Sequence, residues 1–133
     1  VFPETTNRIY NEGHYIANHG YSHKYSTIYQ SPEQILNEYN QCNQIVANTI
    51  KVPEYNSHLF RFPGGFVGGK YAKIKADSLP LLEQNNILYV DWNSLTGDSE
   101  KVNPTEEYLM DNLKKQTNPM ECLLSKYYQL FDE

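Results

Sequence analysis

The stretch ILYVDW at residues 87–92 is the clearest strand of this sequence, because β-branched and aromatic residues follow one another in it. A second apolar run, LFRF at 59–62, ends at Pro63-Gly64-Gly65, where proline and glycine predict a loop. Segments with apolar residues at helical spacing precede and follow both runs. Strands that alternate with helices are typical of a parallel sheet covered on both faces, so the sequence predicts an α/β fold.

Helices are expected wherever apolar residues recur at helical spacing between start and stop signals. The best defined helix begins at SPEQ, residues 31–34. There serine caps the helix, proline takes the first helical position, and the glutamine side chain can bond back to the capping residue, as in a capping box. It should run to about Lys51, because Pro53 stops it. Further helices are expected over residues 4–16, residues 70–84 with Pro80 near the end, and residues 104–115; the tail 119–133 also has helical spacing.

Length and charge limit the classes of function. The 133 residues predict one domain, residues 1–133. The net charge is −5 and no basic cluster is present, which argues against nucleic acid as a partner. No apolar run approaches the ~20 residues of a membrane span. The twelve tyrosines fit a sugar-binding cleft, although structural roles are expected for most of them.

The start of the chain and its cysteines give two further expectations. Val1-Phe2-Pro3 lacks the charged start and apolar segment of a signal peptide, and no initiator methionine is present, so we expect residues upstream to have been removed or to lie outside this sequence. Cys42 and Cys122 do not form a disulfide framework. Cys42 falls on the apolar stripe of the helix expected from residue 31, which predicts a buried thiol.

Two histidines four residues apart, His19 and His23, are the first candidates for chemistry. On a helical turn this spacing brings both imidazole rings to one side, within reach of one cation. Neutral imidazole suits zinc, cobalt, nickel or iron, and a catalytic site needs a third protein ligand and an open position for water. The alternative is a pair of surface histidines without a shared role.

Two more candidate groups follow the predicted strands, at the sheet edge where α/β folds bind ligands. Arg61 precedes the Pro-Gly-Gly turn, which lets the backbone approach a ligand closely; a structural ion pair is the alternative. Asp91 and Trp92 end the second strand, and Asp98 lies in the next turn. Asp98 could pair with Arg61 and Trp92 could form the wall of a pocket, whereas aspartate in such a turn often makes only local hydrogen bonds.

Together these groups resemble the polysaccharide deacetylases, the NodB-homology domains or family 4 carbohydrate esterases. The segment EGHYIANHGYSH, residues 12–23, is similar to their second motif, and RFPGG, residues 61–65, is similar to their third. Residues 91–98 resemble the strand and turn that carry the fourth. The resemblance covers roughly residues 5–115 and implies a partial distorted (β/α) barrel, in which parallel strands alternate with helices.

The resemblance implies metal-dependent hydrolysis of N-acetyl groups from a peptidoglycan- or chitin-like polysaccharide. It makes His19 and His23 ligands of a divalent metal, zinc first and cobalt or nickel as alternatives. Arg61 would orient the catalytic base and Asp98 would hold Arg61. The expected partner is acetylated polysaccharide, and the implied location is extracellular or at the cell wall. Substrate contacts are expected from Tyr21, Pro63, Gly64 and Trp92.

The chain departs from the family pattern in ways that predict impaired activity. The first motif, an Asp-Asp pair that supplies the base and the third metal ligand, is absent; a missing base alone costs about 10²–10⁴ in rate. The late Leu-x-His motif is also absent, since His58 is the last histidine. Ser99 stands where the fourth motif usually has Trp, and Gly20 replaces Ser or Thr. We therefore expect a fragment of the enzyme, or a remnant that self-associates through exposed sheet edges.

Two other functions stay open. One is a non-catalytic carbohydrate-binding remnant of the same fold, which would be favoured if no aspartate lay near the histidine pair. The other is a helical interaction domain in which the histidine pair is incidental. A fold without a parallel sheet that carries Arg61 and Asp98 on one edge would favour this interaction domain.

Overall fold

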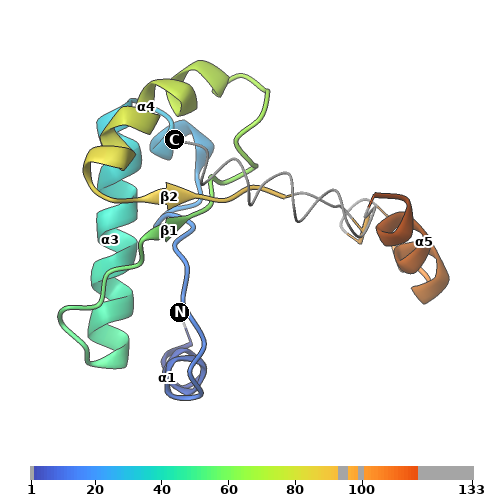
Figure 1. Cartoon of the computed structure of the whole chain (residues 1–133), viewed down its shortest axis with the longest axis horizontal. Coiled ribbons are helices and arrows are strands. Elements are labelled where there is room, and N and C mark those ends of the chain that lie inside the picture. Colours follow the sequence, from blue (N-terminus) through green and yellow to red (C-terminus); the bar gives the residue numbers. More distant parts are fainter. Residues whose placement is uncertain (1, 93–95, 99–100, 117–133) are drawn as a thin grey trace, which may run out of the picture. The chain divides into compact units, whose positions relative to one another are not determined.

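The computed structural model describes residues 2–92, 96–98 and 101–116 (Figure 1). The chain divides into two compact units, residues 1–91 and residues 92–133, so the expectation of one domain over the whole chain stays a prediction. The described helices and strands are, in chain order, α1 (Pro3–Asn11), α2 (Tyr25–Ile28), α3 (Pro32–Ile50), β1 (Leu59–Phe60), α4 (Ala72–Gln84), β2 (Leu88–Tyr89) and α5 (Glu106–Gln116).

The first unit contains a small parallel sheet. Strand β1 pairs with β2 in parallel, with Leu59 opposite Leu88, and Asn18 forms a parallel bridge to Phe60 on the other side of β1. The order across the sheet is therefore the segment around Asn18, then β1, then β2. Helix α3 connects the first two and α4 connects the last two. This confirms a parallel sheet built from strands that alternate with helices.

The two strands are shorter than the sequence predicts. Residues 59–62 and 87–92 are expected to be strands, but regular pairing covers only two residues in each. Strand β1 ends early because the Phe62 carbonyl accepts the Gly65 N–H in a tight turn, 2.9 Å away. That turn carries the chain away from the sheet at the edge where Arg61 lies.

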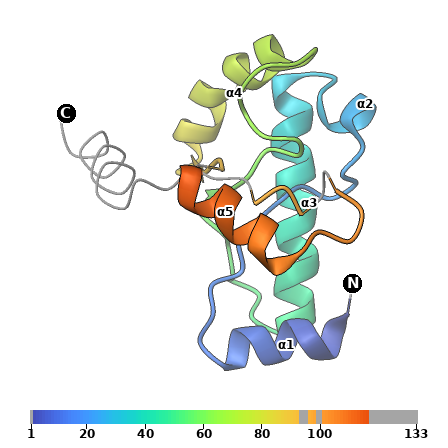
Figure 2. The same cartoon turned by 90° about the vertical axis from the view of Figure 1, so that its right-hand side faces the viewer.

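Helix α3 is the longest element, and its ends follow the sequence signals. The Ser31 side chain accepts the Gln34 N–H at 3.2 Å, as expected for an N-cap. The helix ends at Ile50, and Lys51 takes a left-handed conformation with φ of 59°. Figure 2 shows α1 against the C-terminal end of α3, whereas α4 lies beside its N-terminal half.

A single apolar core connects these elements. Tyr39 of α3, Phe60 of β1 and Leu82 of α4 are each at most 2% exposed and belong to one cluster. The cluster also includes Ile28, Tyr29, Ile35, Phe62 and Ile87. This core fixes the C-terminal ends of the strands relative to the segment before α2, and so it positions the candidate residues of the first unit.

The other expectations about the elements have different outcomes: one needs correction, one is confirmed and one stays untested. The helix expected over residues 4–16 ends at Asn11, because Gly13 has a φ of 85° and the His14 N–H bonds to the Ile9 carbonyl, a glycine-terminated helix end. Helix α4 runs through Pro80 to Gln84. The tail 119–133, with Cys122, and Ser99 lie outside the described residues.

The second unit, as far as the structure describes it, consists of a turn held against α5. The Asn112 side chain donates to the Thr96 carbonyl at 2.9 Å, and the Lys101 ammonium lies 4.3 Å from the centre of the Tyr108 ring. Across both units, none of the described helices has the length and apolar character needed to cross a membrane.

Candidate functional site

Hydrogen bonds of Asn18 hold the segment that carries His19 in place. Its backbone N–H donates to the Leu59 carbonyl and its carbonyl accepts from the Arg61 N–H, so this segment lies along β1. Its buried side chain donates to the Tyr39 carbonyl and to Asn43 Oδ1, and accepts the Gly20 N–H. Asn18 therefore fixes His19, the next residue, relative to both α3 and the end of β1.

Glu38 holds the turn between the two histidines. Although it is only 2% exposed, its carboxylate accepts the Tyr21 N–H at 3.1 Å and the Ser22 N–H at 2.6 Å. Hydrogen bonds to backbone donors compensate the burial of a carboxylate. Gly20 suits this turn, since its φ is 82° and a Cβ there would come 3.0 Å from Ile28.

The two imidazole rings lie close together, but they do not share a helical turn. Their centres are 5.0 Å apart, and the connecting residues form a loop in which Gly20 and His23 have positive φ values of 82° and 54°. The expected helical geometry was wrong; Glu38 and the left-handed residues bring the rings together instead. His23 is exposed and His19 is half-buried.

One hydrogen bond fixes the tautomer of His19. Its Nδ1 lies 2.8 Å from the Arg61 carbonyl oxygen, which can only accept, so Nδ1 carries the hydrogen. The lone pair is then on Nε2, as in histidines that bind metals through that nitrogen. With metal–nitrogen bonds of about 2.0–2.1 Å, two imidazoles on one tetrahedral ion have ring centres about 5 Å apart. The observed spacing fits two ligands of one ion.

The described part of the chain brings no third protein ligand to the pair. Within residues 2–92, 96–98 and 101–116, no cluster of three or more His, Cys, Asp or Glu side chains has the geometry to hold a metal ion. His19 and His23 can therefore supply two ligands to a metal ion, and the other described residues supply no third one.

The Arg61–Gly65 turn is anchored from beneath by two buried side chains. Tyr29 donates its hydroxyl hydrogen to the Pro63 carbonyl at 2.6 Å, and Lys75 of α4 donates to the Gly65 carbonyl at 2.5 Å. Lys75 is 5% exposed and its ammonium lies 5.0 Å from the centre of the Tyr29 ring. Burial lowers the pKa of Lys75, and the charge of Asp91 partly opposes this.

The other predicted residues fall in different places. Tyr21 is 55% exposed, whereas the Pro63 ring is fully buried and can only shape the turn. Gly64 is exposed, with a φ of 74°. Asp91 accepts the Phe66 N–H at 2.9 Å and so holds the residue after the turn. Trp92, in the second unit, is 43% exposed.

Asp98 makes the local hydrogen bond expected of an aspartate in a turn. Its Oδ1 accepts from the Thr96 hydroxyl at 2.6 Å. Since Arg61 lies in the first unit and Asp98 in the second, their pairing stays a prediction.

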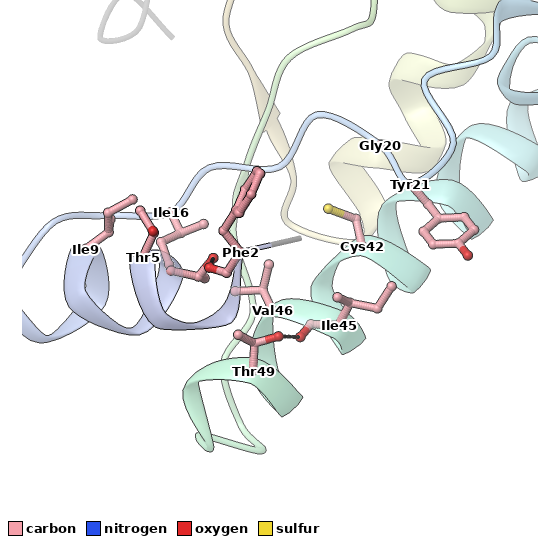
Figure 3. A pocket seen from close by; sticks show the side chains of 11 residues that line it. Phe2, Thr5, Ile9, Ile16, Gly20, Tyr21, Cys42, Ile45, Val46 and Thr49 are labelled. Carbon is pink, nitrogen blue, oxygen red and sulfur yellow. Dashed lines mark hydrogen bonds between the residues drawn. The ribbon is translucent and has the colours of Figure 1, made fainter.

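An apolar groove of about 460 Å³ lies beside the histidine segment (Figure 3). Side chains of α1, of α3 and of the segment before His19 line it, with Tyr21 and Gly20 at one end. Cys42 is one of them and is half-buried, which corrects the expectation of a buried thiol. Burial still raises the pKa of this thiol.

Sequence reasoning missed the residues that support the histidines. Glu38 and Lys75 were not singled out, yet they hold the two turns that meet at His19. Glu38 falls between Ile35 and Tyr39 on the apolar face of α3. A charged residue on such a face is unusual, and this pattern could have identified Glu38 from the sequence.

Comparison with known proteins identifies the family of this chain. Residues 2–83 match the model of a family described as polysaccharide deacetylase. The chain belongs to the polysaccharide deacetylase family. Membership of this family places the chain, at family level, among hydrolases.

Individual members of the polysaccharide deacetylase family are similar over part of their length. A peptidoglycan-N-acetylglucosamine deacetylase of Bacillus cereus is 33% identical over 97 residues, which are 73% of this chain and 31% of that protein. The catalytic domain of a peptidoglycan N-acetylglucosamine deacetylase from Eubacterium rectale aligns with a TM-score of 0.70 at 27% identity, over 86% of this chain and 54% of that one.

A Streptococcus mutans CE4 esterase aligns with a TM-score of 0.71 at 24% identity, over 84% of this chain and 48% of that one, which supports the fold. The chain thus spans about a third to a half of the length of these three proteins.

Proposed function

We propose that this chain takes part in the metal-dependent removal of N-acetyl groups from a peptidoglycan- or chitin-like polysaccharide. The observation that carries the proposal is the histidine pair, with ring centres 5.0 Å apart and with His19 held in the tautomer that leaves Nε2 for a metal. Similarity to a peptidoglycan-N-acetylglucosamine deacetylase supports the substrate class. On the same similarity we propose that the first unit forms part of a distorted (β/α) barrel.

His19 and His23 would hold a divalent ion, with zinc first and cobalt or nickel as alternatives. When bound, such an ion polarises an acetyl carbonyl and lowers the pKa of the attacking water. Arg61, supported by Asp98, is proposed to orient the base. Exposed Gly64 leaves its backbone open to the substrate because it has no side chain. Tyr21 and Trp92 offer exposed rings for sugar.

We further propose that hydrolysis by this chain alone is impaired. The sequence has no Asp-Asp pair, and the described residues bring no third metal ligand to His19 and His23. This observation favours a second candidate, a carbohydrate-binding remnant that keeps the cleft and lacks the chemistry. The parallel strand pair and family membership argue against a purely helical interaction domain.

The first prediction concerns metal binding by the histidine pair. Calorimetric titration with Zn²⁺ and Co²⁺ should show one binding event for the natural chain. His19→Ala or His23→Ala should weaken this binding at least tenfold, because only one imidazole would remain to hold the ion. His58→Ala is the matched control, since His58 is also exposed and also bonds a backbone carbonyl through Nδ1. If calorimetry shows no binding at tens of micromolar metal, the proposed metal site is wrong.

Acetate release from an N-acetylglucosamine oligomer then separates the two candidate functions. Slow release that a chelator and His19→Ala both abolish supports impaired hydrolysis. Binding of the oligomer without any release supports the carbohydrate-binding remnant.

Two further proposals follow from the same similarity. We propose an extracellular or cell-wall location, where an acetylated polysaccharide would be met. We also propose that the chain self-associates through its open sheet edge, since among the described residues no strand pairs with the outer side of the segment around Asn18.

A further inference from the structure

Tyr25, the first residue of α2, lies between the histidine pair and the Arg61–Gly65 turn. Its ring centre is 5.9 Å from that of His23. Its phenol also packs against Gly64, because a Cβ built on Gly64 would come 2.5 Å from the Tyr25 hydroxyl and 2.9 Å from its Cζ. Tyr25 therefore joins the loop that carries the histidines to the turn that follows β1.

The rings of two more tyrosines, Tyr29 and Tyr71, pack near the Tyr25 ring. Its centre is 5.8 Å from that of Tyr29 and 6.5 Å from that of Tyr71, and those two rings are 5.2 Å apart. Tyr29 is only 2% exposed and its hydroxyl bonds to Pro63, so the base of this cluster is fixed. A ring held in this way loses little conformational entropy when a ligand packs against it.

The outer part of Tyr25 is available to a ligand. The residue is 43% exposed, and its hydroxyl makes no hydrogen bond to another of the described residues. By contrast, the hydroxyls of Tyr29, Tyr39 and Tyr55 each donate to a protein oxygen. A phenol can give or accept a hydrogen bond while its face packs against the C–H groups of a sugar ring.

We propose that Tyr25 is a substrate-binding residue that packs against one N-acetylated hexosamine unit and hydrogen-bonds it, beside the histidine pair. This inference rests on the proposed function, because it assumes that an acetylated polysaccharide reaches His19 and His23. Tyr25 was not among the residues that the sequence motifs single out, since it lies outside both the histidine pair and the Arg61–Gly65 segment.

The test is binding of the β-1,4-linked trimer of N-acetylglucosamine, measured by calorimetry on the whole chain with and without Zn²⁺. Tyr25→Phe removes only the hydroxyl and should weaken binding about threefold to tenfold, as expected for one neutral hydrogen bond. Tyr25→Ala also removes the ring and should weaken binding more than tenfold. Tyr10→Phe is the control, because Tyr10 lies in α1 and its ring packs on Tyr55.

The outcomes distinguish the inference from the function on which it rests. If the natural chain binds the trimer and both Tyr25 variants bind it equally well, the role of Tyr25 is wrong while the proposed substrate class stands. An equal loss in Tyr10→Phe would also overturn that role. If the natural chain itself does not bind the trimer, the proposed function and this inference are both wrong. Circular dichroism of Tyr25→Phe verifies that the fold is kept.

Discussion

At the scale of single residues, two glycines with the same backbone angle have different surroundings. Gly64 and Gly68 both have a φ of 74°, where an L-residue costs about 1–2 kcal/mol. A Cβ at Gly68 would have no atom within 4 Å, whereas one at Gly64 would collide with Tyr25. Comparing the two positions therefore separates backbone strain from the contact with Tyr25.

We expect Gly64→Ala to lower the free energy of unfolding by at least about 1 kcal/mol more than Gly68→Ala, because the Tyr25 ring must also leave its packing on Tyr29 and Tyr71. Denaturant unfolding of both variants measures the difference. The difference should shrink when Tyr25→Ala is present in both. Equal losses for the two glycines in the natural background would contradict the close approach of Tyr25 to Gly64.

At the scale of elements, Lys75 connects α4 to the turn that follows β1. Lys75→Met keeps the side-chain volume but leaves the buried Gly65 carbonyl without its donor, a loss of about 1–3 kcal/mol at neutral pH. Lys73→Met is the control, because Lys73 lies on the exposed face of α4, where it pairs with Asp77. Its effect should stay within about 0.5 kcal/mol.

The effect of Lys75 should also depend on pH. Burial lowers its pKa below the ordinary 10.5, so between the folded and unfolded pKa values the unfolded chain binds more protons. The stability of the natural chain relative to Lys75→Met should therefore rise with pH in the window just below 10.5. Unfolding of both chains at neutral pH and near pH 10 measures this; an unchanged difference would show that the ammonium is not desolvated.

The elements that sequence predicted best are those with local signals. Ser31 and Pro32 mark the start of α3, and the Pro63-Gly64-Gly65 turn marks the end of β1. The geometry of the histidine loop was missed because it depends on Glu38, sixteen residues after Ser22. Local spacing favours a helical turn, but a long-range hydrogen bond decides the conformation.

At the scale of the whole molecule, the open sheet edge predicts association. The backbone groups of Asn18 face β1, so those of Ala17 and His19 face the opposite side. We expect concentration-dependent dimers at tens of micromolar protein in analytical ultracentrifugation. Ala17→Pro, which removes the outward N–H, should shift the chain toward monomer, while Ala17→Ser should not. A natural chain that stays monomeric at the highest soluble concentration would exclude edge pairing.

The anchoring of the two turns has an evolutionary consequence. Glu38, Tyr29 and Lys75 all bond to main-chain atoms of the turns rather than to side chains. Side chains within the turns can therefore drift over generations without breaking these bonds, as long as the backbone keeps its path. Purifying selection for the backbone path should fall on the three anchors, which lie outside the visible motifs, as well as on Gly20 and Gly64. Distant homologues could then keep the paths of both turns after the other side chains of the motifs have changed.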